Sequence, residues 1–256
     1  MTNNKSTCVP LAALFLALAG CGGGSGSSGG TTPAAPVPSA QGAYSGNYSN
    51  GSQHFTVVLE NDQFYTLYGN TTGGVFALAG FVQGNGSSSN GSFTASDVRD
   101  ATAAGQLLSG SLSATYIAGT SFNGTLTEGA NTIAFSGTPL ASSVYNYNAA
   151  ANLADIAGVW NLTSLRGFSN TFTIAAAGSF TAVSGGCSFS GSFTPRSSGK
   201  NAFDVAVTFG PAPCALPGQS LSGLAVDYPV SAGSRQLVIA LLNQARTSSS
   251  AFVGVR

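Results

Sequence analysis

The chain has 256 residues, of which only 6% are charged, and its eight basic side chains balance eight acidic ones. So little charge leaves no basic stripe for nucleic acid and no acidic tail, so no nucleic-acid partner is expected. An aromatic content of 10% argues against disorder. Abundant glycine, serine, threonine, valine and phenylalanine, with scarce lysine and glutamate, favours an all-β fold over one with long helices.

The first feature along the chain is a short apolar run, residues 9–19, that follows a polar start carrying Lys5. A charged beginning, an apolar middle and small residues at a cut are typical of a secretory signal. The run is too short to span a bilayer, which takes about 20 apolar residues. We therefore expect residues 1–20 to be a signal peptide that is removed.

The run ends in Leu18-Ala19-Gly20-Cys21, which resembles the lipobox of bacterial lipoproteins. The resemblance implies cleavage before Cys21, a thioether lipid on its sulfur and acylation, for instance with palmitate, of the new N-terminus. Membrane attachment would then pass through Cys21. Lipoproteins of this kind stay in the inner membrane mainly when aspartate follows the cysteine. Gly22 stands there, which favours the outer membrane and leaves the periplasmic and cell-surface faces both open.

Residues 21–41 are rich in glycine, serine and proline and predict a lipidated flexible tether. From Gly42 onward, short runs with period-two alternation are separated by Gly, Asn and Ser, which is typical of antiparallel strands. We expect a first β unit over residues 42–140, a linker over 141–155 and a second β unit over 156–256. Strands of the first unit are predicted at 44–48, 55–60, 64–68, 75–83, 93–98, 107–116, 122–126 and 132–136.

The second unit repeats the plan of the first with a similar number of short runs. Leu221-Ser222-Gly223 echoes Leu108-Ser109-Gly110, and Ala251-Phe252-Val253-Gly254 echoes Ala134-Phe135-Ser136-Gly137. An internal duplication would explain these echoes. About eight consecutive short strands hide their edges as an up-and-down barrel or as a two-sheet sandwich, and both remain open for each unit. A closed eight-stranded barrel is filled by side chains or holds one small ligand.

The cysteines serve different purposes. Cys8 leaves with the signal and Cys21 is the expected lipid anchor, so Cys187 and Cys214 remain in the exported chain. Two leftover cysteines outside the cytoplasm usually pair, so we predict a disulfide between them. The alternative, a metal site, is poor because two thiols have no histidine nearby.

The segment from Leu153 to Trp160 resembles the opening of a lipocalin-type barrel, in which a short helical turn leads to Gly-x-Trp. Gly158 and Trp160 match that opening, while the family's Thr-Asp-Tyr motif between late strands is missing. The resemblance implies that Trp160 closes the base of a barrel against an arginine from a late strand. Arg256 or Arg246 could supply this cation, stacked on the indole face.

Catalytic groups are scarce. His54 is the only histidine, opens a predicted strand beside a turn, and is expected at the surface. Two carboxylate pairs, Glu60 with Asp62 and Asp97 with Asp100, lie near strand ends, where such side chains mostly bond backbone amides. Acid–base or Ca²⁺ chemistry is the alternative for them. We expect no catalytic residue, no bound metal and no cofactor, and hence no enzyme.

Tyrosine is the one surplus residue, with seven of its eight copies in the first unit or at its exit. Its apolar body and polar tip suit binding faces, so Tyr44, Tyr65, Tyr68 and Tyr116 are candidate binding residues. Cross-strand packing is the structural alternative.

The resulting hypothesis is a non-catalytic, lipid-anchored binding module for a small apolar ligand or an envelope protein. The alternative is a surface adhesin or a structural and interaction lipoprotein of the envelope.

Overall fold

The computed structural model describes residues 38–256, so the predicted signal peptide, Cys21 and nearly all of the tether lie outside the described residues. The described chain is all-β, with strands joined by short turns and one helical turn, α1 (Leu153–Ile156). The predicted fold class is confirmed. No helix in this part of the chain is both long and apolar enough to cross a membrane.

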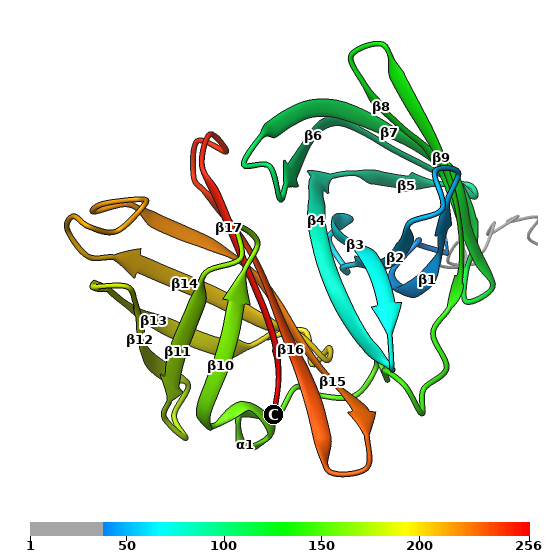
Figure 1. The fold of residues 1–256 in the computed structure, drawn as a ribbon. Coiled ribbons are helices and arrows are strands. Elements are labelled where there is room, and N and C mark those ends of the chain that lie inside the picture. The colour runs from blue at the N-terminus through cyan, green and yellow to red at the C-terminus, as the bar shows by residue number, and fades with distance from the viewer. Residues whose placement is uncertain (1–37) are drawn as a thin grey trace, which may run out of the picture. The chain divides into compact units, whose positions relative to one another are not determined.

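The first nine strands form an antiparallel sheet that closes on itself, because β4 pairs with β6 from Gly80↔Thr102 to Gly84↔Val98. The short β5 pairs only with the start of β6. The strands are β1 (Gly42–Tyr48), β2 (Gln53–Val58), β3 (Gln63–Thr72), β4 (Val75–Asn85), β5 (Ser87–Ser89), β6 (Ser92–Thr102), β7 (Leu107–Ile117), β8 (Ser121–Glu128) and β9 (Asn131–Pro139). We call this closed sheet barrel 1 (Figure 1).

The remaining eight strands form a second closed barrel, barrel 2, in which each strand pairs with the next and β17 pairs back to β10. Its strands are β10 (Gly158–Ser164), β11 (Ser169–Ile174), β12 (Ser179–Ser184), β13 (Cys187–Pro195), β14 (Phe203–Phe209), β15 (Ser220–Ser231), β16 (Ser234–Asn243) and β17 (Ser249–Val255). The predicted runs fall within strands, except that the run at 55–60 continues past Val58, where β2 ends. Because the sheet closes on itself in both units, each unit is a barrel and not a two-sheet sandwich.

The interior of each barrel follows from period-two alternation, because one face of every strand points inward. In barrel 2 most of the inward face is apolar, and polar residues, among them Asn170 and Asp227, are buried toward its ends. Its core comprises Ile156, Trp160, Leu162, Phe172, Ile174, Phe180, Phe189, Phe193, Phe203, Val205, Val207, Phe209, Leu221, Leu237, Ile239, Leu241 and Phe252. Burial of these side chains, worth roughly 1.5–3 kcal/mol for each large one, holds barrel 2 together.

Barrel 1 is apolar at one end only. Its apolar core comprises Tyr44, Tyr48, Val58, Phe64, Val82, Phe93, Ala95, Val98, Leu112, Tyr116, Phe122, Leu126 and Phe135. The segment before β1 covers the end where β1 begins. There the Tyr116 hydroxyl donates to the Pro38 carbonyl at 2.6 Å, and Ser88 Oγ accepts from the Ala40 amide at 3.1 Å. We call the opposite end, where β1 stops and β2 starts, the polar end.

The two barrels belong to one compact unit and share an apolar cluster formed by their outward faces. Phe81 and Tyr65 from barrel 1 lie in this cluster with Val226 and Val238 from barrel 2. The predicted domain boundaries stay a prediction, as does the internal duplication. The predicted linker, residues 141–155, contains the start of α1, whose first turn is capped by the Asn152 side chain accepting from the Ala154 amide at 3.1 Å.

Candidate functional site

One end of barrel 2 is closed by α1 and by the only tryptophan. Trp160 is 1% exposed and donates through its indole Nε1 to the Ile156 carbonyl at 2.7 Å. The Arg256 guanidinium lies 4.5 Å from the centroid of the indole ring. Its Nη2 donates to the Asp155 carbonyl at 3.0 Å. Gly158 has φ of 116°, and a Cβ there would lie 2.6 Å from the arginine Nη1, so glycine makes room for this contact.

Arg256 therefore takes the position that the lipocalin resemblance implied, and Arg246 does not. The Arg246 guanidinium instead pairs with the Asp97 carboxylate and donates to the Gln83 carbonyl at 2.9 Å. In each barrel a ring of eight antiparallel strands closes in a lipocalin-like form, with β5 outside the ring of barrel 1, and barrel 2 also has the tryptophan–arginine base.

The other end of barrel 2 contains a cavity of about 270 Å³, which we call the cup. Phenylalanine rings form its apolar wall, with Phe189, Phe209 and Phe252 among them. Small polar residues, such as Ser250 and Ser164, lie beyond these rings at the ends of their strands. Bulky side chains at these positions would fill the barrel. The cup exists because the last inward positions of several strands are small.

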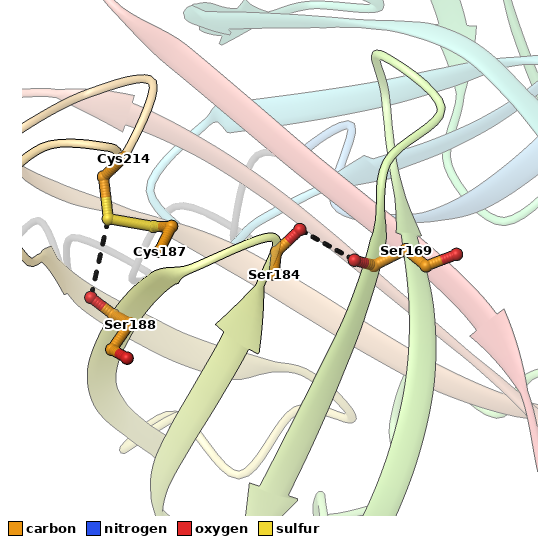
Figure 2. Close-up of a disulfide and its surroundings, with 5 residues drawn as sticks. All are labelled: Ser169, Ser184, Cys187, Ser188 and Cys214. Atoms are coloured by element: carbon orange, nitrogen blue, oxygen red, sulfur yellow. Dashed lines mark hydrogen bonds between the residues drawn. A yellow bond between two sulfur atoms is a disulfide. The ribbon is translucent and has the colours of Figure 1, made fainter.

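A disulfide holds the loop between β14 and β15 at the rim of the cup. Cys187 and Cys214 are bonded across 27 residues with their Cα atoms 4.5 Å apart, which confirms the predicted pairing (Figure 2). Pro213 of that loop lines the cup. The Cys214 sulfur lies 3.6 Å from the Ser188 carbonyl oxygen, a contact without a proton because disulfide sulfur carries none. In the chain-entropy model such a loop stabilises by about 3.5 kcal/mol.

Asn170 is the most buried polar residue of the cup at 5% exposed, and the other polar residues that line it are Ser164, Arg166, Ser184, Ser249, Ser250 and, from barrel 1, Thr102. Its amide nitrogen donates to the Leu162 carbonyl at 3.3 Å and to the Phe168 carbonyl at 2.6 Å. The amide oxygen is therefore the acceptor that remains for a ligand. Aromatic walls with a small number of placed polar groups are typical of small-molecule sites.

The polar end of barrel 1 brings together side chains that were not expected to meet. Asp100 on β6 is 6% exposed and accepts from the Tyr68 hydroxyl at 2.9 Å. Burial, followed by the nearby Glu128 carboxyl, raises the pKa of Asp100 to about 7. Burial likewise raises the pKa of Glu128. The pair thus holds one proton between two carboxyls near neutral pH.

The expectation of a surface histidine is wrong, because His54 is 2% exposed and points into barrel 1. Its Nε2 lies 2.9 Å from the Ser136 carbonyl oxygen and its Nδ1 lies 3.0 Å from Thr56 Oγ1. A carbonyl only accepts, so Nε2 carries the proton and Nδ1 accepts from Thr56. Burial lowers the pKa of His54, which favours this neutral form.

The other carboxylates divide between capping and ion pairing. Asp62 accepts from the Ser88 amide at 2.7 Å, as expected of a residue in a turn. Glu60 pairs with Arg196 at 2.6 Å. Asp97 is exposed and pairs with Arg99 at 2.9 Å, so it does not join Asp100 inside the barrel.

The four candidate tyrosines are not gathered into one surface. The Tyr44 hydroxyl donates to the Ala40 carbonyl at 2.9 Å, and that of Tyr116 donates to Pro38, so both hold the segment before β1. Tyr68 is at the polar end, and Tyr65 lies in the cluster shared by the barrels. Ligand binding by these tyrosines stays a prediction.

Sequence reasoning missed Asp100 and Glu128 as a pair although the alternation contains the signal. Glu128 shares the inward face of β8 with Leu126, and Asp100 follows Val98 on the inward face of β6. Their position near turns concealed this, because acidic residues at strand ends usually face solvent. A bulge in β6 between Ala95 and Val98 also shifts the alternation by one residue.

Comparisons with known proteins identify little. No protein-family model matches the chain, and no curated protein resembles it in sequence. Among solved structures it is similar to a protein of unknown function from the DUF3598 family of Nostoc punctiforme, with 14% identity and a TM-score of 0.27. That match covers 84% of this chain and 94% of the other.

Proposed function

We propose that this protein is a non-catalytic binding module that holds a small apolar ligand in the cup of barrel 2. The observation that carries the proposal is the cavity of about 270 Å³, lined by Phe189, Phe209 and Phe252, at the open end of an otherwise filled barrel. Displacing water from such a wall favours apolar ligands. Asn170 supplies an acceptor that orients a ligand carrying one hydroxyl or amide.

The surroundings of the cup support a binding role. The disulfide limits movement of the rim loop, and a preorganised rim lowers the ordering cost of binding. His54, the only histidine, has both ring nitrogens engaged by Thr56 and Ser136 and lies in the other barrel. It is therefore placed as a structural residue, which favours binding over catalysis.

The test uses N-phenyl-1-naphthylamine, an apolar dye that fluoresces when it leaves water. Energy transfer from Trp160, the single tryptophan, reports dye bound inside barrel 2. Ser250→Phe fills the cup and should abolish the transfer, whereas Ser222→Phe on the exposed face of β15 should leave it unchanged. Circular dichroism checks that both variants fold. Equal transfer in both variants, or none in the wild type, contradicts the proposal.

We further propose that the module is attached to the outer membrane by lipid on Cys21, which would leave the barrels on a tether of residues 21–41. The support is the run ending in Leu18-Ala19-Gly20-Cys21, and more than one acyl chain is needed for stable anchoring. Cys21→Ser should move the protein from the membrane fraction to the soluble one and prevent labelling with palmitate. A wild-type mature mass without lipid contradicts this proposal and leaves the ligand proposal intact.

A further inference from the structure

The wall of the cup carries one charged side chain, Arg166, in the turn between β10 and β11. Among the described residues that line the cavity, no other is charged. The backbone of this turn is fixed, because the Gly167 amide donates to the Ser164 carbonyl at 2.8 Å. The Leu165 amide donates to the Ala251 carbonyl of β17 at 2.8 Å, which ties the turn to the barrel. The arginine therefore has a set place on the rim.

The Arg166 guanidinium packs against barrel 1, at the turn between β6 and β7. Gly105 of that turn has φ of 81°, and a Cβ placed there would lie 2.9 Å from Arg166 Nη2 and 3.1 Å from its Cζ. A side chain at residue 105 would push the guanidinium away, so glycine lets the planar group lie against the backbone. One face of the guanidinium is thus supported, and its N–H donors lie in the plane of the group.

Arg166 differs from the other arginines of the described chain in having no charged or aromatic partner. None of the ion pairs within residues 38–256 involves it. By contrast, the guanidinium groups of Arg196 and Arg246 pair with carboxylates, and that of Arg256 lies on the Trp160 ring. Arg166 thus presents a positive charge and a fork of N–H donors to whatever enters the cup.

The apolar part of the wall is aromatic. Phe189, Phe209 and Phe252 line the cup, and Phe168, which is 63% exposed, lies beside them two residues after Arg166. Aromatic rings pack favourably on other rings, offset or edge to face. The volume of about 270 Å³ lies just below the usual range for ligand sites, roughly 300–1,000 Å³. A body of one or two rings therefore suits this wall and this volume better than a long flexible chain.

We propose that the ligand of the cup is a small aromatic carboxylate, with its ring against the phenylalanines and its carboxylate paired with Arg166 at the rim. The proposal rests on the proposed function, because it names the class of ligand that the cup holds. A carboxylate matches the planar guanidinium and can accept two parallel hydrogen bonds from it. One arginine balances one negative charge, so a carboxylate suits the rim better than a phosphate dianion.

The arginine gives selectivity and the aromatic wall gives most of the affinity. Arg166 is exposed, so water and salt screen its ion pair. Removing its charge should therefore weaken binding of an aromatic carboxylate by about threefold to tenfold. Binding of a neutral aromatic compound of the same shape should not change. Raising the salt concentration should act in the same direction as removing the charge.

The experiment is isothermal titration calorimetry of the purified full chain with three probes of similar size. These are 2-naphthoate, its neutral counterpart 2-naphthalenemethanol, and octanoate, an aliphatic carboxylate. Wild-type protein should bind 2-naphthoate about threefold to tenfold more tightly than either of the others. Arg166→Gln should lower the affinity for 2-naphthoate to that for the alcohol.

Two control variants locate the effect. Lys200→Gln, which removes an equal charge in the loop between β13 and β14, should leave the affinities for all three probes unchanged. Ser250→Phe, which fills the cup, should abolish binding of both naphthalene probes. Circular dichroism checks that the variants fold.

The outcomes separate this proposal from the proposed function. Equal binding of the two naphthalene probes to wild type, or unchanged binding of 2-naphthoate to Arg166→Gln, would overturn the role of the arginine and leave a ligand cup. Octanoate that binds as tightly as 2-naphthoate would overturn the aromatic class. If Arg166→Gln also loses the alcohol, Arg166→Lys decides: retained preference for 2-naphthoate supports the proposal, and equal affinities overturn it. A wild type that binds none of the probes would contradict the proposed function, and this proposal with it.

Discussion

Barrel 1 and barrel 2 have the same strand order and opposite interiors. Barrel 2 is filled by aromatic and aliphatic side chains, with Phe172 at its centre in contact with the rings of Phe180, Phe189 and Phe252. Barrel 1 is apolar at one end and carries Asp100 and His54 toward the other. The number of strands that close the barrel sets the size of its interior. The inward side chains decide whether that interior is packed, contains a cavity or holds groups that titrate.

The largest expected effect comes from breaking the apolar packing of barrel 2. Phe172→Ala removes a fully buried ring and should lower the free energy of unfolding by about 3–5 kcal/mol. Thr173→Ala, on the exposed face of the same strand, should change it by less than about 0.5 kcal/mol. Urea titration followed by Trp160 fluorescence measures both. Similar losses in the two variants would mean that barrel 2 is not the packed core described.

A slightly smaller effect is expected from the disulfide, which belongs to barrel 2 alone. Replacing Cys187 and Cys214 together by serine should cost about 3.5 kcal/mol in the chain-entropy model. Trp160 fluorescence should report the loss, whereas the pH dependence of barrel 1 should remain. Mass spectrometry after alkylation of the unreduced wild type should find neither thiol free. Labelled thiols at both positions would disprove the bond.

The smallest effect, about 1–3 kcal/mol, is the pH dependence that the buried groups of barrel 1 contribute. Asp100 has a folded pKa near 7, above its unfolded value, so its contribution is full at low pH and is lost as pH rises toward 7. Asp100→Asn should remove this decline and be more stable than wild type at pH about 8 in metal-free buffer.

His54 acts with the opposite sign, because burial lowers its pKa below the unfolded value. Its contribution is present above pH about 6.5 and is lost as pH falls. His54→Gln should therefore flatten the acid side of the profile, whereas Asp100→Asn flattens the neutral side. Circular dichroism melts across pH resolve the two. A wild-type profile unchanged by either substitution would show that the polar end of barrel 1 does not titrate in this range.

Much of the fold could be predicted because strand alternation is a local property. Runs such as Phe203, Val205, Val207 and Phe209 place their apolar residues on one face whatever the partner strand. The Cys187–Cys214 disulfide followed from counting cysteines, and the Trp160 base followed from a short resemblance. The sequence alone thus determined most of the strands, the disulfide and the place of Trp160 at the base of barrel 2, but not the short β5 or which arginine stacks on the indole.

Only the tertiary structure decided what the interiors contain. The choice of barrel over sandwich depended on pairing between strands far apart in sequence, β4 with β6 and β10 with β17. The cup depends on which small residues reach the rim together, and the carboxyl pair depends on a bulge that turns Asp100 inward toward Glu128. These are non-local properties, because closure brings together residues whose separation along the chain says nothing about their distance in space.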